Sequence, residues 1–128
     1  MLPKLRQVTL LTEIPVKYFK IEEFNCQETG ENKMLPEFLN ILDDLRDLCA
    51  FPFVITSGYR SPQHPIEAAK AVPGTHSQGI AADIKVSSGS QKHTLVRHAM
   101  ALGFSGIGVA DTFIHVDLRD STPVMWTY

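Results

Sequence analysis

Cysteine is scarce in this chain: Cys26 and Cys49 are the two among 128 residues. Small disulfide-stabilised scaffolds carry more cysteines, and these two do not form the Cys-x-x-Cys pair that is common in zinc sites. We therefore expect two free thiols that pack as small apolar side chains. Stability then depends on a hydrophobic core, and a chain of this length is large enough to bury one.

The sequence also lacks a strong net charge, a basic run and a long apolar run. Its formal net charge of −2 gives no electrostatic reason to expect nucleic acid as a partner. No apolar stretch approaches the roughly 20 residues that span a bilayer. Residues 1–6 lack the charged start and the apolar stretch of a secretory signal peptide. We expect no nucleic acid, no membrane and no signal peptide.

Internal repeats, low-complexity segments and interdomain linkers are absent too. Apolar residues make up 44% of the chain and charged residues 20%, which is typical of a globular protein and not of a disordered one. We therefore predict a single domain over residues 1–128, and we expect it to act as a monomer.

Hydrophobic periodicity predicts the main elements. Apolar residues recur at spacings of three and four between 35 and 49, which predicts an amphipathic helix that starts near Pro36 and ends before Pro52. Ser88 and Gly103 are capping signals for a second helix. The remaining predictions are strands at 53–56, 80–86, 106–109 and 113–118, an edge strand at 8–11, a helical turn at 21–24 and a short helix at 63–71. Because strands and helices do not alternate strictly, the pattern favours an α+β fold, with a small antiparallel sheet and flanking helices.

His76, Asp83 and His115 are the residues most suggestive of chemistry. Two imidazoles and one carboxylate are the donor set of a catalytic zinc site, which keeps its fourth position open for water. Asp117 follows His115 by two residues, so both side chains should point to the same face of a strand. A histidine on a strand is more often a core or surface residue than a ligand, so these residues alone leave zinc binding open.

Three motifs appear in order along the chain: Ser57-Gly58-Tyr59-Arg60-Ser61, then His76-x-x-Gly79-x-Ala81-x-Asp83-Ile84, and then Gly106-x-Gly108 with Phe113-Ile114-His115-Val116-Asp117-Leu118-Arg119. In this order and spacing they resemble the M15 family of zinc peptidases. That family includes D-Ala-D-Ala carboxypeptidases and peptidoglycan-cleaving domains of bacteria and phages, and hedgehog signalling domains share its metal cradle. The resemblance covers about residues 18–120.

The resemblance implies a zinc ion held by His76, Asp83 and His115, with Arg60 facing the substrate. It implies a hedgehog-like and D,D-peptidase-like fold. The expected activity is hydrolysis of amide bonds in peptidoglycan stem or cross-link peptides, by a D,D-carboxypeptidase or an endolysin-type endopeptidase. A small chain of this kind resembles phage or prophage wall enzymes, which stay in the host cytoplasm before release to the cell wall or travel in the virion.

The general base stays open at this point. Vancomycin-resistance dipeptidases carry a glutamate three residues before the last histidine ligand, and here that position is Thr112, which cannot act as a base. The remaining acids are Asp117, which we prefer, Asp111 and, more remotely, Glu67. Asp117 could instead orient the imidazole of His115 and fix its tautomer. Without a base, the chain would be a non-catalytic zinc-containing module that binds cell wall or a partner, as hedgehog domains show.

Overall fold

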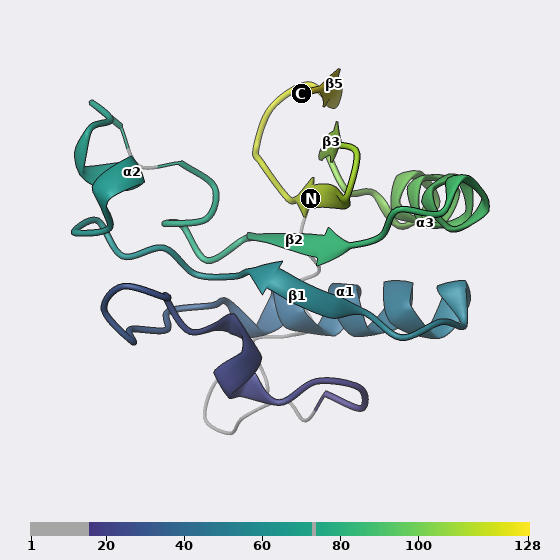
Figure 1. Cartoon of the computed structure of the whole chain (residues 1–128), viewed down its shortest axis with the longest axis horizontal. Helices are drawn as coiled ribbons and strands as arrows, with labels where there is room; N and C mark the ends of the chain where they lie inside the picture. The colour runs from purple at the N-terminus through teal and green to yellow at the C-terminus, as the bar shows by residue number, and fades with distance from the viewer. Residues whose placement is uncertain (1–15, 73) are drawn as a thin grey trace.

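The computed structural model describes residues 16–72 and 74–128, and Figure 1 shows a sheet accompanied by helices. In chain order the elements are η2 (Ile21–Phe24), α1 (Pro36–Cys49), β1 (Val54–Ser57), α2 (Pro65–Ala68), β2 (Ala81–Lys85), α3 (Gly89–Leu102), β3 (Gly106–Val109), β4 (Phe113–Asp117) and β5 (Val124–Thr127). The predicted α+β class, a small sheet with flanking helices, is confirmed.

The sheet has the strand order β1-β2-β4-β3-β5. The first four strands pair antiparallel, and β5 pairs parallel to β3 at the edge. The two central strands, β2 and β4, place Asp83 directly opposite His115. The sheet therefore brings together residues that lie more than thirty positions apart in the sequence.

The two long helices begin and end at the signals that the sequence predicts. Pro36 occupies the first turn of α1, and the helix ends at Ala50, whose φ of 59° is left-handed. Ser88 caps α3 by accepting a hydrogen bond from the backbone N–H of Gln91, and Gly103 ends it with a φ of 91°. Both helices pack against each other and contribute side chains to one hydrophobic core.

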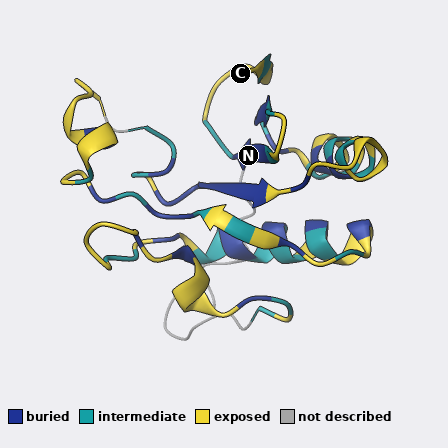
Figure 2. Cartoon of the chain, viewed as in Figure 1, coloured by how far each residue is buried: buried dark blue, intermediate teal, exposed yellow. Residues whose placement is uncertain are grey.

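The core lies on one face of the sheet because alternate strand residues point to it. Each fully buried aliphatic or aromatic side chain in it stabilises the fold by about 1.5–3 kcal/mol. Figure 2 shows this burial along β2 and on one side of α1. The residues that alternate with the core-facing ones point to the other face, and they include Asp83, His115 and Asp117. Core residues from both layers are Phe38, Leu42, Leu45, Ile84, Leu95, Ile107, Ile114 and Val116.

Several predictions need correction or lie outside the described residues. The short helix predicted at 63–71 is confined to α2, because the chain turns after Ala69 and the Gly74 N–H donates to the side chain of Glu67. Strand β5 was not predicted at all. The edge strand predicted at 8–11 lies outside the described residues.

Cys26 and Cys49 are free and buried, as the sequence predicts. The turn predicted at 21–24 is the 3-10 helix η2. Among the described residues, no helix has both the length and the apolar character needed to cross a membrane.

Candidate metal centre

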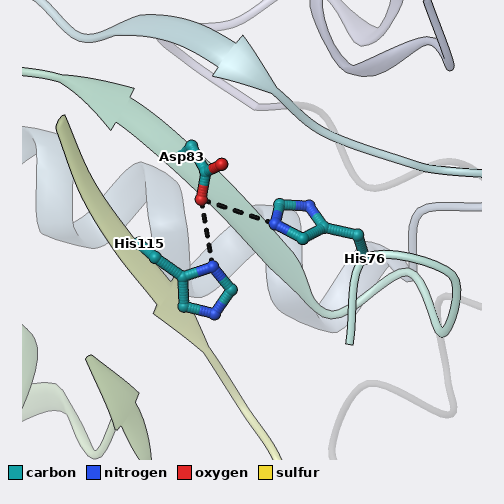
Figure 3. Close-up of side chains that lie close together, drawn as sticks. All are labelled: His76, Asp83 and His115. Carbon is teal, nitrogen blue, oxygen red and sulfur yellow. Dashed lines mark hydrogen bonds and ion pairs between the residues drawn. The ribbon is translucent and has the colours of Figure 1, made fainter. Parts of the chain in front are cut away.

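His76, Asp83 and His115 converge on one point above the sheet (Figure 3). Oδ1 of Asp83 lies 3.4 Å from Nε2 of His76 and 3.0 Å from Nδ1 of His115. All three residues are buried. One ligand atom from each residue lies within 4.8 Å of the other two. The convergence proposed from the sequence is therefore present in the fold, and the metal-binding role of the three residues remains a prediction.

Two structural features bring His76 to the sheet. Gly79 ends the loop after His76 with a φ of +76°, and a Cβ at this position would lie 2.2 Å from the carbonyl oxygen of Lys33. No other residue type fits such a close approach in a left-handed conformation. The Gly79 carbonyl in turn accepts a hydrogen bond from the N–H of Leu35, just before α1.

Hydrogen bonds on the far side of each ring fix the histidine tautomers. Nδ1 of His76 lies 2.7 Å from the carbonyl oxygen of Gly58, which can only accept, so this nitrogen carries the hydrogen. Nε2 of His115 lies 2.7 Å from Oδ2 of Asp117, so this nitrogen is the donor there. The free lone pairs are then Nε2 of His76 and Nδ1 of His115, and both face Asp83.

This donor set is suited to a cation. Two imidazole lone pairs and one carboxylate oxygen repel each other unless a proton or a metal ion lies between them. Burial alone would lower the pKa of His115, but hydrogen bonds with Asp117 and Asp83 outweigh it and raise that pKa. Burial would raise the pKa of Asp83, yet its contacts with His115 and His76 hold it well below its usual range. The described residues supply three donors, the number found in catalytic zinc sites.

Asp117 is fully buried beneath His115. Besides the hydrogen bond from the His115 ring, its carboxylate accepts hydrogen bonds from Nε and Nη2 of Arg119. The distance from Nη2 to Oδ2 is 2.7 Å. Burial opposes ionisation, but these hydrogen bonds keep the pKa of Asp117 well below its usual range. Gly106 leaves the space for this carboxylate, since a Cβ there would lie 2.3 Å from both oxygens. These contacts are those expected of a carboxylate that orients a ligand imidazole.

Arg60 lies beside the Asp83 carboxylate of the cluster. Its Nη2 is 4.0 Å from Oδ2 of Asp83 and its Nη1 is 3.7 Å from Oε2 of Glu67. Ser77 donates a hydrogen bond of 2.6 Å to the Arg60 carbonyl, which ties this loop to the loop of His76. The guanidinium therefore lies between two carboxylates, with part of its surface open to solvent.

Glu67, which the sequence suggested only as a remote acid, is buried and holds the Arg60 loop together. Its carboxylate accepts hydrogen bonds from Lys70 at 2.8 Å and from the Gly74 N–H at 2.9 Å. Burial would raise the pKa of Glu67, but these bonds lower it to about 2. Asp111, the other alternative acid, is exposed in the turn between β3 and β4.

Trp126 is the site residue that sequence reasoning missed. Its ring lies 5.2 Å from the ring of His115, and Cζ of Arg119 lies 4.8 Å from the Trp126 ring centre. Aromatic enrichment at residues 124–128 was the available signal, but no element was predicted after residue 118. Its position depends on the parallel pairing of β5 with β3, which the local sequence does not encode.

Comparison with known families agrees with this geometry. The sequence model of the family described as Peptidase M15 matches residues 17–117. The chain belongs to the peptidase M15 family. No curated protein matches this M15 peptidase closely enough to count as a relative. The matched region contains Arg60 and all three residues of the cluster, and it ends at Asp117, so β5 lies beyond it.

Proposed function

We propose that this M15 peptidase is a zinc enzyme that hydrolyses amide bonds in peptidoglycan stem or cross-link peptides. The observation that carries the proposal is the convergence of His76, Asp83 and His115, with fixed tautomers, in a chain of this family. The peptidoglycan substrate rests on the resemblance to D-Ala-D-Ala carboxypeptidases and to phage wall enzymes. A carboxypeptidase would release a terminal D-alanine, whereas an endopeptidase would cleave a cross-link between two stem peptides.

Nε2 of His76, Oδ1 of Asp83 and Nδ1 of His115 are the atoms that would hold the zinc ion. A zinc ion bound by such a set lowers the pKa of water to about 7 and polarises a carbonyl group. The chain's own contribution begins with Gly58 and Asp117, which hold the two rings so that the correct nitrogens face inward. The orientation of both rings is therefore set by hydrogen bonds to groups outside the three-residue cluster.

Arg60 has the chemistry to bind the substrate beside this centre. Its guanidinium is anchored by Glu67 on one side, and it retains donors that can pair with a peptide carboxylate or a developing oxyanion. Lysine cannot reproduce this planar, two-donor geometry. We assign Arg60 to substrate binding and to stabilisation of negative charge in the transition state.

We assign Asp117 to positioning, in preference to the role of general base. Its oxygens accept from both His115 and Arg119, and the side chain is fully buried. A base must be within hydrogen-bond reach of the proton that it takes. A buried carboxylate with two cationic or N–H partners instead keeps the His115 tautomer fixed.

The decisive experiment is digestion of muropeptides. Zinc-loaded protein is incubated with muropeptides from walls of several chemotypes, and the products are identified by mass spectrometry. We expect loss of a terminal alanine or cleavage of a cross-link, and no product with His76→Ala. The exposed His93 provides the matched control, since His93→Ala should remain active. Fully zinc-loaded wild-type protein that releases no product would contradict the peptidase proposal.

A second candidate is a non-catalytic zinc-containing module that binds cell wall or a partner. Thr112 stands where related dipeptidases carry their glutamate, and Asp117 and Glu67 are already engaged by basic or N–H partners. Binding to isolated wall sacculi without release of any peptide would favour this candidate. Release of peptides would exclude it.

We propose a monomer as the acting form and, from the resemblance to phage wall enzymes, a phage or prophage origin. The protein would then accumulate in the host cytoplasm before release to the wall, or travel in the virion. Light scattering after size-exclusion chromatography measures the molar mass and tests whether the protein is a monomer. A dimer at micromolar concentration would contradict it.

A further inference from the structure

One row of residues crosses the sheet on the face of the metal centre. Asp83 of β2 is opposite His115 of β4, His115 is opposite Gly108 of β3, and Gly108 is opposite Trp126 of β5. Because Gly108 has no side chain, the indole reaches across β3 toward His115. A Cβ at Gly108 would lie 2.6 Å from Nε1 of Trp126, so the indole lies flat on the backbone there.

Two further aromatic residues continue from this row. The ring of Tyr128 lies 5.0 Å from that of Phe113 and 6.4 Å from that of Trp126. Tyr128 is 70% exposed, although it lies beside the cluster. We call Phe113, Trp126 and Tyr128 the aromatic wall. Burial of the phenol and the negative charges of Asp83 and Asp117 raise the pKa of Tyr128, although a hydrogen bond with Trp126 and the positive charge of Arg60 oppose this increase.

The aromatic wall and Arg60 contact different residues of the cluster. Arg60 approaches Asp83 from the loops after β1, whereas Trp126 approaches His115 from β5. A peptide bound across the cluster would then have a cation near one end and uncharged aromatic faces near the other. Arg119, the cation nearest the wall, is already bound to Asp117 and stacks on Trp126.

We infer that the aromatic wall is a binding site for a small, uncharged aliphatic side chain of the substrate. Aromatic side chains that remain partly or largely open to solvent gain from covering alkyl groups, and the Trp126 ring, which could attract a cation, is already stacked by Arg119. The wall therefore determines specificity for the residue beside the bond that is cut. This inference rests on the proposed peptidase function. Trp126 of β5 and Tyr128, which follows β5, lie outside the region matched to the family, whereas Phe113 lies within it.

The test compares two peptides that differ only in methyl groups: diacetyl-L-lysyl-D-alanyl-D-alanine and the same peptide with glycine in both alanine positions. We expect zinc-loaded wild-type protein to favour the alanine peptide in kcat/KM by about 5- to 20-fold. Tyr128→Ala should reduce this preference to about 2-fold, mainly by raising KM. Tyr128→Phe keeps the ring and should keep more than half of the preference.

Met125→Ala is the matched control, because Met125 is 50% exposed and lies beside Trp126 on β5, with its side chain on the opposite face of the sheet. It should retain the wild-type preference, and zinc content should be stoichiometric in every variant. A Tyr128→Ala protein that keeps the full preference overturns the inference, as does a wild-type protein with no preference. If wild type cleaves neither peptide, the proposed activity on these peptides fails. In that case, isothermal titration calorimetry measures the Kd of each peptide for the same zinc-loaded proteins and tests the aromatic wall alone. The ratio of the two Kd values in each protein should match the preference in kcat/KM given above.

Discussion

At the scale of single residues, the candidate site is defined by what lies behind each ligand. His76 and His115 each present one ring nitrogen to Asp83 because a carbonyl or a carboxylate accepts from the other nitrogen. Arg60 is likewise held by Glu67. The orientation of each of these side chains therefore depends on a partner outside the cluster, and substitutions can separate the two roles.

Substitution of Arg60 tests its role toward the substrate. Arg60→Lys keeps the positive charge but loses the planar pair of donors. We expect kcat/KM to fall by about 5- to 150-fold, equivalent to about 1–3 kcal/mol of transition-state stabilisation, with zinc content and folding unchanged. Peptide hydrolysis, zinc analysis and circular dichroism measure these quantities. Arg97→Lys, on the exposed surface of α3, is the control. Unfolding of the Arg60 variant at ordinary temperature would instead indicate a structural arginine.

Substitution of Asp117 separates positioning from general-base catalysis. Asp117→Asn removes the charge that holds Nε2 of His115. If Asp117 positions the imidazole, zinc affinity should fall by about 10- to 100-fold, and added zinc should restore activity. If it were the base, zinc would stay bound and hydrolysis would fall by about 10²- to 10⁴-fold. Competition with a chelator gives the affinity. Asp111→Asn is measured in parallel, and loss of activity there would identify Asp111 as the base.

At the scale of elements, local sequence determined most of the fold. The periodicity at 35–49, with Pro36 at its start, predicted α1, and the caps Ser88 and Gly103 predicted α3. Both signals are local, because they depend on neighbours within one or two turns. β5 gave no comparable signal, since it is short and pairs in parallel with β3, where Gly106 is opposite Val124. Without β5, the position of Trp126 beside His115 could not be predicted.

The candidate site was predicted in part for the same reason. His76, Asp83 and His115 stand out as residue types with a familiar order, and strand alternation placed Asp117 on the face of His115. The sequence did not predict that Glu67 would contact Arg60 or that Arg119 would contact Asp117. The first contact depends on the path of the chain between Arg60 and α2, and the second on the turn that follows Asp117. These partners lie close together in the sequence, but their contacts depend on loop and turn conformations that residue types alone do not predict.

The loop around α2 provides a prediction about acid stability. The folded-state pKa of Glu67 is about 2, below its ordinary value of 4.5. Its contribution to the free energy of unfolding is therefore complete above about pH 4.5 and is lost as the pH falls toward 2. Glu67→Gln should destabilise the protein by about 1–3 kcal/mol at pH 7, since Lys70 and Gly74 lose their charged acceptor. The difference from wild type should narrow between pH 5 and pH 2.

Urea unfolding of both proteins across this pH range measures the difference. The exposed Glu22 in η2 supplies the control. The free energy of unfolding of Glu22→Gln should stay within about 0.5 kcal/mol of the wild-type value. A difference between wild type and Glu67→Gln that is independent of pH would show that the carboxylate charge contributes nothing to stability.

At the scale of the whole molecule, the sheet separates two tasks. One face packs against α1 and α3, and the other carries Asp83, His115 and the aromatic wall. The three residues of the candidate metal centre come from a loop and from two different strands, so they come together only when the chain is folded. Anything that binds them all must therefore favour the folded state over the unfolded one.

Zinc should consequently stabilise the protein. At a free zinc concentration one hundred times the Kd, the expected gain is about 2.7 kcal/mol, which raises Tm by several degrees for a chain of this size. Differential scanning calorimetry with zinc, and again after a chelator is added, measures the shift. The Tm of His76→Ala should change little when zinc is added, whereas the Tm of His93→Ala should rise as much as that of wild type. An unchanged wild-type Tm at saturating zinc would contradict binding at this cluster.

The place of Trp126 has a practical consequence. It is the only tryptophan in the chain, and its ring lies 5.2 Å from the ring of His115. All of the indole fluorescence of these 128 residues therefore originates beside the candidate metal centre. The intensity and wavelength of that emission should respond to ion binding, to peptide binding and to unfolding, so the molecule carries its own optical probe and needs no dye.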